Sequence, residues 1–156
     1  MLKINWFKLI TSIIICQLAG IIGSFFTAKS VSNWYLTLNK PSFNPPGWVF
    51  APVWTLLFLL MGISLYLLWQ KGFKRSKSAL YAFTGQYILN IAWSFCFFYL
   101  QNPLAGFIEI IILWIFIILT IISFYKIKPL ASYLLFPYLA WVSFAALLNF
   151  MLYYLN

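Results

Sequence analysis

The stretch LAGFIEIIILWIFIILTIISFY, from Leu104 to Tyr125, is the clearest sign of the fold in this sequence. An α-helix needs about 20 apolar residues to cross the roughly 30 Å hydrocarbon core of a bilayer. This stretch reaches that length and contains a single charged residue, Glu109. We therefore expect residues 104–125 to form a membrane-spanning helix.

Four other apolar runs flank this stretch, at about residues 7–26, 49–70, 79–100 and 130–155. In the whole chain 65% of the residues are apolar, 7% are charged and the mean hydropathy is +0.97, which no soluble domain of this size resembles. The alternative for the first run is a signal peptide, but its apolar part is too long and no small-residue cleavage site follows it. We predict an all-α membrane protein in which residues 1–156 form one domain, a five-transmembrane-helix bundle.

The basic residues predict the orientation of this bundle, because basic loops near span ends stay in the cytoplasm. On one side of the predicted spans lie Lys3, Lys8, Lys71, Lys74, Arg75, Lys77, Lys126 and Lys128. On the other side lie only Lys29 and Lys40. We predict a multi-pass protein of the cell membrane with a cytoplasmic N-terminus and an external C-terminus. The net charge of +9 is better explained by anionic lipid headgroups than by nucleic acid, because its main cluster adjoins two span ends.

Several kinds of chemistry are excluded by the residues that the sequence lacks. It contains no histidine and one acidic residue, Glu109. Imidazole bases, histidine metal sites, histidine-ligated haem and paired-carboxylate mechanisms are therefore excluded. Cys16 and Cys96 lie inside apolar runs without a neighbouring charge, where thiols pack as hydrophobic groups. We expect no disulfide, no metal and no required cofactor.

The connection between the first two spans, residues 27–47, is the longest in the chain, and loops of this length are commonly lids or binding segments. We expect it to be an external loop. Its prolines predict a rigid extended turn that leads into the second span. The aromatic residues are typical of either a lid or an anchor in the lipid headgroups, and both readings remain open. The candidate lid residues are Trp34, Tyr35, Lys40, Pro41, Pro45, Pro46 and Trp48.

Aromatic and polar residues recur at helical spacing inside three of the predicted spans and so define faces. These faces hold Trp54, Phe58, Met61 and Leu65; Asn90, Trp93 and Phe97; and Tyr138, Trp141, Ala145 and Leu148. Buried amides need partners in hydrocarbon, so Asn90 and Asn149 should face the interior of the bundle. Pro137 should remove a helical hydrogen bond to the carbonyl of Tyr133 and can bend the fifth span. Plain packing explains most such faces, whereas aromatic walls with a few polar groups are also typical of a site for flat apolar ligands.

Small residues also recur four apart in the first span, as Ala19 with Gly23 and Gly20 with Ser24. Such pairs permit close approach of helices, within a monomer or between two copies.

A family resemblance rests on motifs along most of the chain. The motifs are Trp34-Tyr35, KPSFNPPGWVFAPVW from Lys40 to Trp54, LN-x-x-W from Leu89 to Trp93, and PYLAWVSFAALLN from Pro137 to Asn149. Together they resemble the translocator protein / tryptophan-rich sensory protein (TspO/MBR) family. The resemblance implies a five-helix bundle, commonly a homodimer, with a pocket under the first loop. Such pockets bind porphyrins such as protoporphyrin IX, planar isoquinoline or benzodiazepine-type drugs and, in some members, sterols.

The resemblance also implies roles for individual residues. Trp54 and Trp141 would be pocket aromatics, Asn90 a polar contact and Ala145 part of the wall, with Trp93 and Phe97 nearby. In the family the two pocket tryptophans are linked to light-dependent porphyrin breakdown, so Trp54 and Trp141 are the candidates for such a reaction.

The chain departs from the family pattern at several positions. Phe43 stands where many members have Trp, and Phe58 where some have Tyr. The sterol-recognition pattern near Phe150 is incomplete, because no Lys or Arg follows Tyr154, which argues against cholesterol binding. We expect a membrane receptor, sensor or transporter for porphyrins and similar planar apolar ligands. The alternatives are a light-dependent porphyrin-degrading enzyme and a small multidrug exporter, which would need Glu109 as its intramembrane carboxylate.

Overall fold

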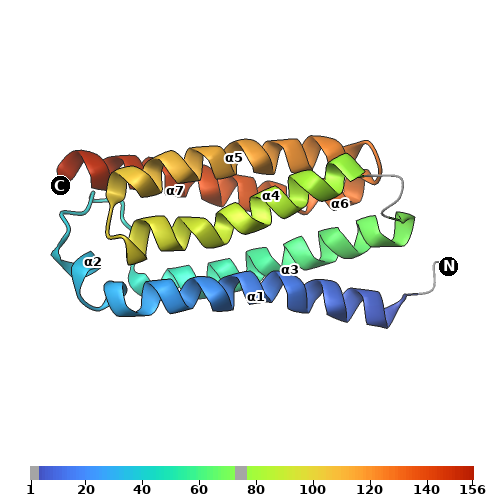
Figure 1. Cartoon of the computed structure of the whole chain (residues 1–156), viewed down its shortest axis with the longest axis horizontal. Coiled ribbons are helices and arrows are strands. Elements are labelled where there is room, and N and C mark those ends of the chain that lie inside the picture. Colours follow the sequence, from blue (N-terminus) through green and yellow to red (C-terminus); the bar gives the residue numbers. More distant parts are fainter. Residues whose placement is uncertain (1–3, 73–76) are drawn as a thin grey trace.

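The computed structural model describes residues 4–72 and 77–156, and within these ranges the chain is helical without a β-strand. Its long helices lie side by side along the long axis of the molecule (Figure 1). In chain order the elements are α1 (Trp6–Val31), α2 (Trp34–Thr37), α3 (Gly47–Lys71), α4 (Lys77–Ser94), the π-helix η2 (Phe95–Tyr99), α5 (Pro103–Tyr125), α6 (Pro129–Tyr133) and α7 (Phe136–Leu155).

Local sequence signals explain where several of these helices begin and end. The side chains of Asn5 and Asn102 cap α1 and α5 by accepting hydrogen bonds from backbone N–H groups three residues ahead, which satisfies donors that a helix start leaves unpaired. Gly72 ends α3 at a positive φ of 86°, a conformation that glycine adopts without steric cost. Pro137 lies in the first turn of α7, directly after the interruption that separates α6 from α7. The fifth span, for which the sequence predicted a bend at Pro137, is interrupted between Tyr133 and Phe136, ahead of the proline.

Four segments of the described chain are long and apolar enough to cross a membrane: α1, α3, α5 and the combined stretch Pro129–Leu155. The predicted third span does not qualify in this way, because α4 ends at Ser94 and carries polar Gln86 and Asn90. The chain is thus an all-helical protein with four recognisable candidate spans. The first span also ends later than predicted, since α1 extends past Phe26 to Val31, and the short helix α2 lies within the predicted 27–47 loop.

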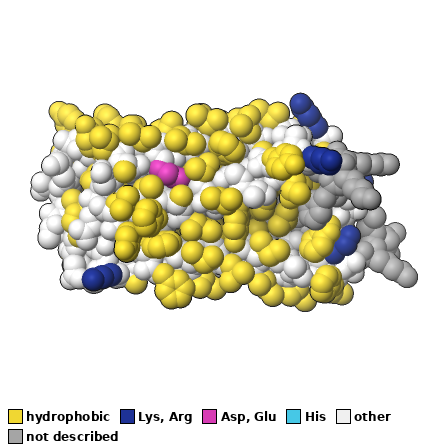
Figure 2. Space-filling model, viewed as in Figure 1, with side chains coloured by type: hydrophobic (Ala, Val, Ile, Leu, Met, Phe, Trp, Pro, Cys, Tyr) yellow, Lys and Arg dark blue, Asp and Glu magenta, His cyan; other side chains and the backbone are white. Residues whose placement is uncertain are grey.

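Side-chain packing joins the helices into one bundle, in which α1 packs against α3, α4 against α5, and α5 against α7. Gly62 of α3 permits a close approach to the backbone of α1, because a Cβ there would lie 2.7 Å from the Cα of Ile13. Apolar side chains also cover much of the outer surface (Figure 2). An apolar exterior around an apolar core is what a membrane protein needs, since lipid surrounds it.

The two ends of the bundle differ in charge. One end, which we call the loop end, holds α2, residues 38–46 and the C-terminus, and at the opposite end the N-terminus begins α1 (Figure 1). Lys29 and Lys40 belong to the loop end, whereas the other described lysines flank helix termini at the opposite end: Lys8, Lys71, Lys77, Lys126 and Lys128. The predicted split of charge thus holds along the bundle for these residues. Lys3, Lys74 and Arg75 lie outside the described residues.

Candidate functional site

A cavity of about 580 Å³ lies between the helices at the loop end. It is lined by residues from 17–31 of α1, 47–58 of α3, 90–98 of α4 and η2, and 141–152 of α7, together with Tyr35. This volume is within the usual range of small-molecule pockets, about 300–1,000 Å³.

The other half of the bundle holds buried core side chains and a smaller pocket of about 310 Å³, which Leu65 and Phe83 help to line. Leu68, Phe124 and Ala131 belong to the buried cluster there, and none of them lines the cavity at the loop end. From the α2 segment, Tyr35 contributes to the wall of that cavity.

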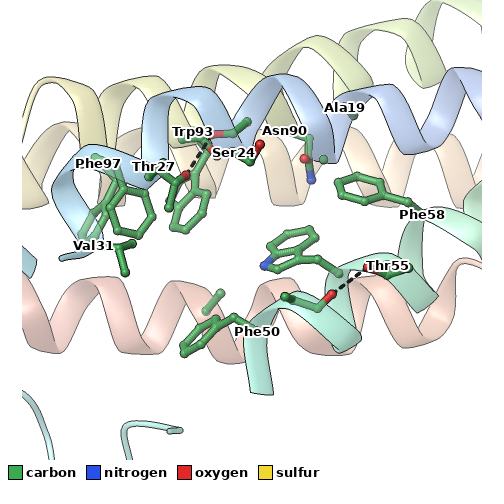
Figure 3. A pocket seen from close by; sticks show the side chains of 18 of the residues that line it. Ala19, Ser24, Thr27, Val31, Phe50, Thr55, Phe58, Asn90, Trp93 and Phe97 are labelled. Carbon is green, nitrogen blue, oxygen red and sulfur yellow. Dashed lines mark hydrogen bonds between the residues drawn. The ribbon is translucent and has the colours of Figure 1, made fainter. Parts of the chain in front are cut away.

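All six residues that the sequence suggested as ligand contacts line this cavity: Trp54, Asn90, Trp93, Phe97, Trp141 and Ala145. They come from α3, from the consecutive helices α4 and η2, and from α7. Figure 3 shows Asn90, Trp93 and Phe97 on one side of the cavity, with Phe50 and Phe58 on other parts of its wall.

Stacked aromatic rings form a continuous part of the wall. The ring of Trp54 stacks on Phe58 with centroids 5.5 Å apart and on Trp93 at 6.3 Å. Trp93 in turn stacks on Phe97 at 5.7 Å with an interplanar angle of 13°. Trp141 meets Phe50 edge-on at 5.9 Å. Flat aromatic surfaces of this kind suit a flat apolar ligand, because stacked and edge-on ring contacts add to the free energy of burial.

Of three polar groups in this wall, two have a hydrogen-bond partner and one has none among the described residues. The Asn90 side-chain amide donates to the hydroxyl of Tyr138 at 2.8 Å, and the indole N–H of Trp93 donates to Oδ1 of Asn149 at 3.2 Å. The Nε1 atom of Trp141 is buried without a hydrogen-bond partner among the described residues. A buried N–H without a partner is costly, so a ligand acceptor that displaced the atoms covering this N–H would satisfy it.

Helix α1 contributes a wall that the sequence reasoning did not include in the site. Ser24 and Thr27 line the cavity beside Gly20. The hydroxyls of Ser24, Thr27 and Thr55 each donate to a carbonyl of their own helix, at 2.6, 2.9 and 2.8 Å, so they offer the cavity few free donors. The signal that pointed to this wall was the spacing of small residues, which we interpreted only as packing. Gly20 serves both for close packing and as part of the cavity wall. The packing is close because a Cβ on Gly20 would lie 2.8 Å from the Phe58 ring.

The first half of the predicted lid contacts the cavity wall. The ring of Trp34 meets Phe97 at 5.5 Å, and the ring of Tyr35 lies 5.8 Å from that of Phe98. The Tyr35 hydroxyl donates to Oδ1 of Asn44 at 3.0 Å, which joins the two sides of the loop. Burial raises the pKa of the Tyr35 hydroxyl above its usual value, and the hydrogen bond with Asn44 opposes this shift.

The second half of the loop is attached to the C-terminal residues. The backbone N–H of Asn39 donates to Oδ1 of Asn156 at 2.8 Å, and Nδ2 of Asn156 donates to the Asn39 carbonyl at 3.0 Å. The Asn39 side chain also donates to the carbonyl of Leu155 at 3.3 Å. We call this set of three bonds the C-terminal clasp. Next to it, the Lys40 ammonium lies 4.8 Å from the centre of the Tyr35 ring, in reach of a cation–π interaction.

The prolines and Trp48 occupy the margin of the site. Pro41 is buried and Pro45 is partly buried, whereas Pro46 precedes α3 and caps its start. Trp48 is 77% exposed and does not line the cavity. Its position at a helix end is typical of an aromatic residue at the lipid headgroups.

Glu109 lies apart from the cavity. Its side chain is only 7% exposed, and neither carboxyl oxygen has a hydrogen-bond partner among the described residues. It does not line the cavity. Glu109 is the only acidic residue in the sequence. The cavity wall therefore has no side-chain carboxylate, which an ion-coupled exporter would need there.

Neither cysteine is paired, with Cys16 buried and Cys96 partly buried. The part of the chain that the structure describes holds no cluster of His, Cys, Asp and Glu side chains suited to a metal ion. What this site can offer a ligand is therefore aromatic surface and a few neutral polar groups.

Comparisons with known proteins find relatives along most of the chain. Residues 12–155 match the family model described as the TspO/MBR family. The chain is 50% identical to a tryptophan-rich protein TspO of Archaeoglobus fulgidus over 152 residues, which cover 97% of this chain and 99% of the relative. It is 48% identical to a protein of the same name from Chlorobaculum tepidum, over 91% of each chain. The translocator protein of Homo sapiens is 36% identical over 86% of this chain and 81% of its own length.

Proposed function

This chain belongs to the TspO/MBR family, and on that premise we propose that it is a membrane receptor, sensor or transporter that binds porphyrins and similar planar apolar molecules in the cavity at the loop end. The observation that carries the proposal is the stack of Phe58, Trp54, Trp93 and Phe97 along the wall of a cavity of about 580 Å³. Drug-sized ligands are usually held by such apolar walls and a small number of fixed polar groups. Protoporphyrin IX is the candidate ligand, and drug-like planar molecules would use the same surfaces.

The few polar groups give this ligand class its orientation. Trp141 has a buried indole N–H without a partner among the described residues, and Asn90 is held in place by Tyr138. Both side chains line the cavity. A planar molecule with acceptor atoms in or beside its ring system would satisfy the Trp141 N–H while its faces contact the rings.

The proposal extends to the assembly and the membrane. We propose five crossings, of which α4 and η2 form the third, because the polar residues of α4 avoid lipid: Asn90 and Ser94 line the cavity, and Gln86 is buried against the sulfur of Met61. We further propose that the N-terminus is cytoplasmic, that the C-terminus and loop are external, and that the protein forms a homodimer as its family commonly does. Chemical cross-linking in native membranes tests the dimer, and a monomer at all cross-linker concentrations would reject it.

Binding is tested by titrating the purified protein with protoporphyrin IX in darkness and following the quenching of tryptophan fluorescence. We expect Trp54→Ala and Trp141→Ala to weaken binding about tenfold or more, since each removes a large apolar wall. Trp6→Ala is the matched control, because Trp6 is exposed at the start of α1, at the end of the bundle opposite the cavity. Equal weakening by all three variants, or by none, would reject this cavity as the binding site.

A second function, light-dependent degradation of the bound porphyrin, is favoured by one observation. Trp54 and Trp141 line the cavity, and indole is the most easily oxidised side chain near the proposed ligand, whereas no acid–base pair is present. The absorbance of protoporphyrin IX mixed with the protein distinguishes the two functions. A loss of absorbance that requires both light and the protein supports degradation, and a constant absorbance supports binding alone.

A further inference from the structure

Two residues of the cavity wall are supported from behind by α5, a helix that does not line the cavity. Phe97 and Asn149 both line it, yet each is only 2% exposed. Their opposite sides must therefore contact other parts of the protein. The helix behind them is α5, near its start at Gly106.

Gly106 leaves no room for a side chain at this contact. A Cβ on Gly106 would lie 2.7 Å from Cδ2 and 2.9 Å from Cβ of Phe97, and 3.2 Å from Oδ1 of Asn149. Distances under 3.0 Å essentially never occur around real Cβ atoms. Any larger residue at this position would push Phe97 and Asn149 away from α5, and the free space in that direction is the cavity.

Both of these residues hold the same indole. Oδ1 of Asn149 accepts the hydrogen bond from Trp93 at 3.2 Å, and the ring of Phe97 stacks on Trp93. Nδ2 of Asn149 donates to the carbonyl of Ala145 at 2.8 Å, which fixes the amide to α7. A displacement of Phe97 or Asn149 would therefore move Trp93 and disturb its stacking on Trp54.

We propose that Gly106 is a positioning residue that sets the depth of the cavity, by allowing Phe97 and Asn149 to recede far enough for a broad planar ligand to lie against Trp93. The inference rests on the proposed function for the identity of the ligand. It assigns α5 a role in ligand selection although α5 touches no ligand, and it identifies position 106 as one where side-chain size selects between broad and narrow ligands.

The test is Gly106→Ala, measured by the affinity for protoporphyrin IX in darkness. We expect the affinity to fall about tenfold, the scale of effect that overpacking has in a close-packed site. Gly85→Ala is the matched control, since a Cβ at Gly85 would collide with the Phe116 ring at 2.4 Å while neither residue lines the cavity. We expect Gly85→Ala to retain wild-type affinity.

A double variant separates positioning from a general loss of stability. Alanine at position 97 lacks Cδ2, the atom of Phe97 that lies nearest to the new Cβ, so Phe97→Ala should partly restore binding in the Gly106→Ala background, although Phe97→Ala alone weakens it. Equal weakening by Gly85→Ala, or the absence of any restoration in the double variant, would overturn the proposal.

A measurement without ligand keeps this inference distinguishable from the proposed function. Near-ultraviolet circular dichroism reports the environment of the stacked indoles, and we expect Gly106→Ala to change the spectrum of the ligand-free protein while Gly85→Ala preserves it. If the wild-type protein fails to bind protoporphyrin IX but the spectra differ in this way, the proposed ligand is wrong and the positioning role stands. An unchanged spectrum in Gly106→Ala would reject the positioning role itself.

Discussion

At the scale of single residues, Trp54 and Trp141 have two properties that substitution can separate, their flat surface and the ease with which indole is oxidised. Phenylalanine retains an aromatic wall, and an aromatic contact contributes only about 0.5–1.5 kcal/mol beyond area burial. We expect Trp54→Phe and Trp141→Phe to keep most of the porphyrin affinity but to lose most of any light-driven porphyrin loss. The measurement is porphyrin absorbance under illumination, with dark samples as the control. Phenylalanine variants that consume porphyrin at the wild-type rate would exclude indole oxidation.

Tyr35 provides a pH-dependent property of the loop. Burial raises its pKa above the usual tyrosine value of about 10. The neutral phenol is thus favoured in the folded loop, so its contribution to stability is fully present below about pH 10 and is lost as the pH rises through the higher folded-state pKa. The measurement is the absorbance of tyrosinate as the pH is raised, in the wild type and in Tyr35→Phe. The difference between the two curves should show one group that titrates above pH 10. A difference curve centred below pH 10 would contradict the burial of this hydroxyl.

The sequence predicted correctly which residues share a helix face where helical spacing alone decides it. Asn90 and Trp93 share a face because residues three apart do so in any α-helix, and Phe97 keeps this face although it lies in the π-helix η2. The hydrogen bond between Trp93 and Asn149 was not predictable, since it joins residues of separate helices whose rotation about their axes is set by packing. The α1 wall was missed for the same reason, because glycine and serine spacing indicates close packing without saying what lies opposite.

At the scale of helices, the contact between α1 and α3 depends on Gly62. A Cβ there would lie 2.7 Å from the Cα of Ile13, and a backbone atom cannot rotate away as a side chain can. We expect Gly62→Ala to destabilise the protein by about 1–3 kcal/mol, even though alanine is the better helix former by up to about 1 kcal/mol. The melting temperature in detergent measures this.

Gly47→Ala is the control for that measurement, because nothing lies within 4 Å of the corresponding Cβ position. It should leave the melting temperature nearly unchanged. A Gly62→Ala variant as stable as Gly47→Ala would show that the two helices pack less closely than described.

The C-terminal clasp connects two elements that are distant in sequence. Asn156→Ala removes two of its three hydrogen bonds, each worth about 0.5–1.5 kcal/mol net. We expect porphyrin to dissociate a few-fold faster, because the loop over the cavity opens more often, and stopped-flow fluorescence measures the rate. Asn33→Ala is the control, since the Asn33 amide donates only to Lys29 within the preceding turn. Equal acceleration in both variants would mean that the clasp does not control access.

The apolar runs predicted most helices because hydropathy determines both membrane insertion and helix length. The predicted runs 49–70 and 104–125 differ by only a few residues from α3 and α5. The sequence predicted the third helix less well, since the change from α4 to the π-helix at Phe95 depends on a local hydrogen-bond shift that hydropathy does not report. The end of α1 was missed because Ser30 continues the helix and donates to the carbonyl of Phe98 at 2.7 Å, a contact between distant residues.

At the scale of the whole molecule, the distribution of lysines makes the orientation testable. Ser42 lies in the loop and Ser78 at the start of α4, and both are exposed. In a variant without Cys16 and Cys96, we expect Ser42→Cys to react with an impermeant maleimide in intact cells and Ser78→Cys to react only after the membrane is permeabilised. Labelling of Ser78→Cys in intact cells would reverse the orientation.

The place of the cavity within the bundle has a consequence for the proposed ligand. The cavity lies in the half of the bundle nearest the loop end, and buried side chains such as Leu68, Phe124 and Ala131 lie between the helices in the other half. Passage of a bound molecule to the opposite end of the bundle would therefore require these side chains to move apart, whereas release toward the loop end would not.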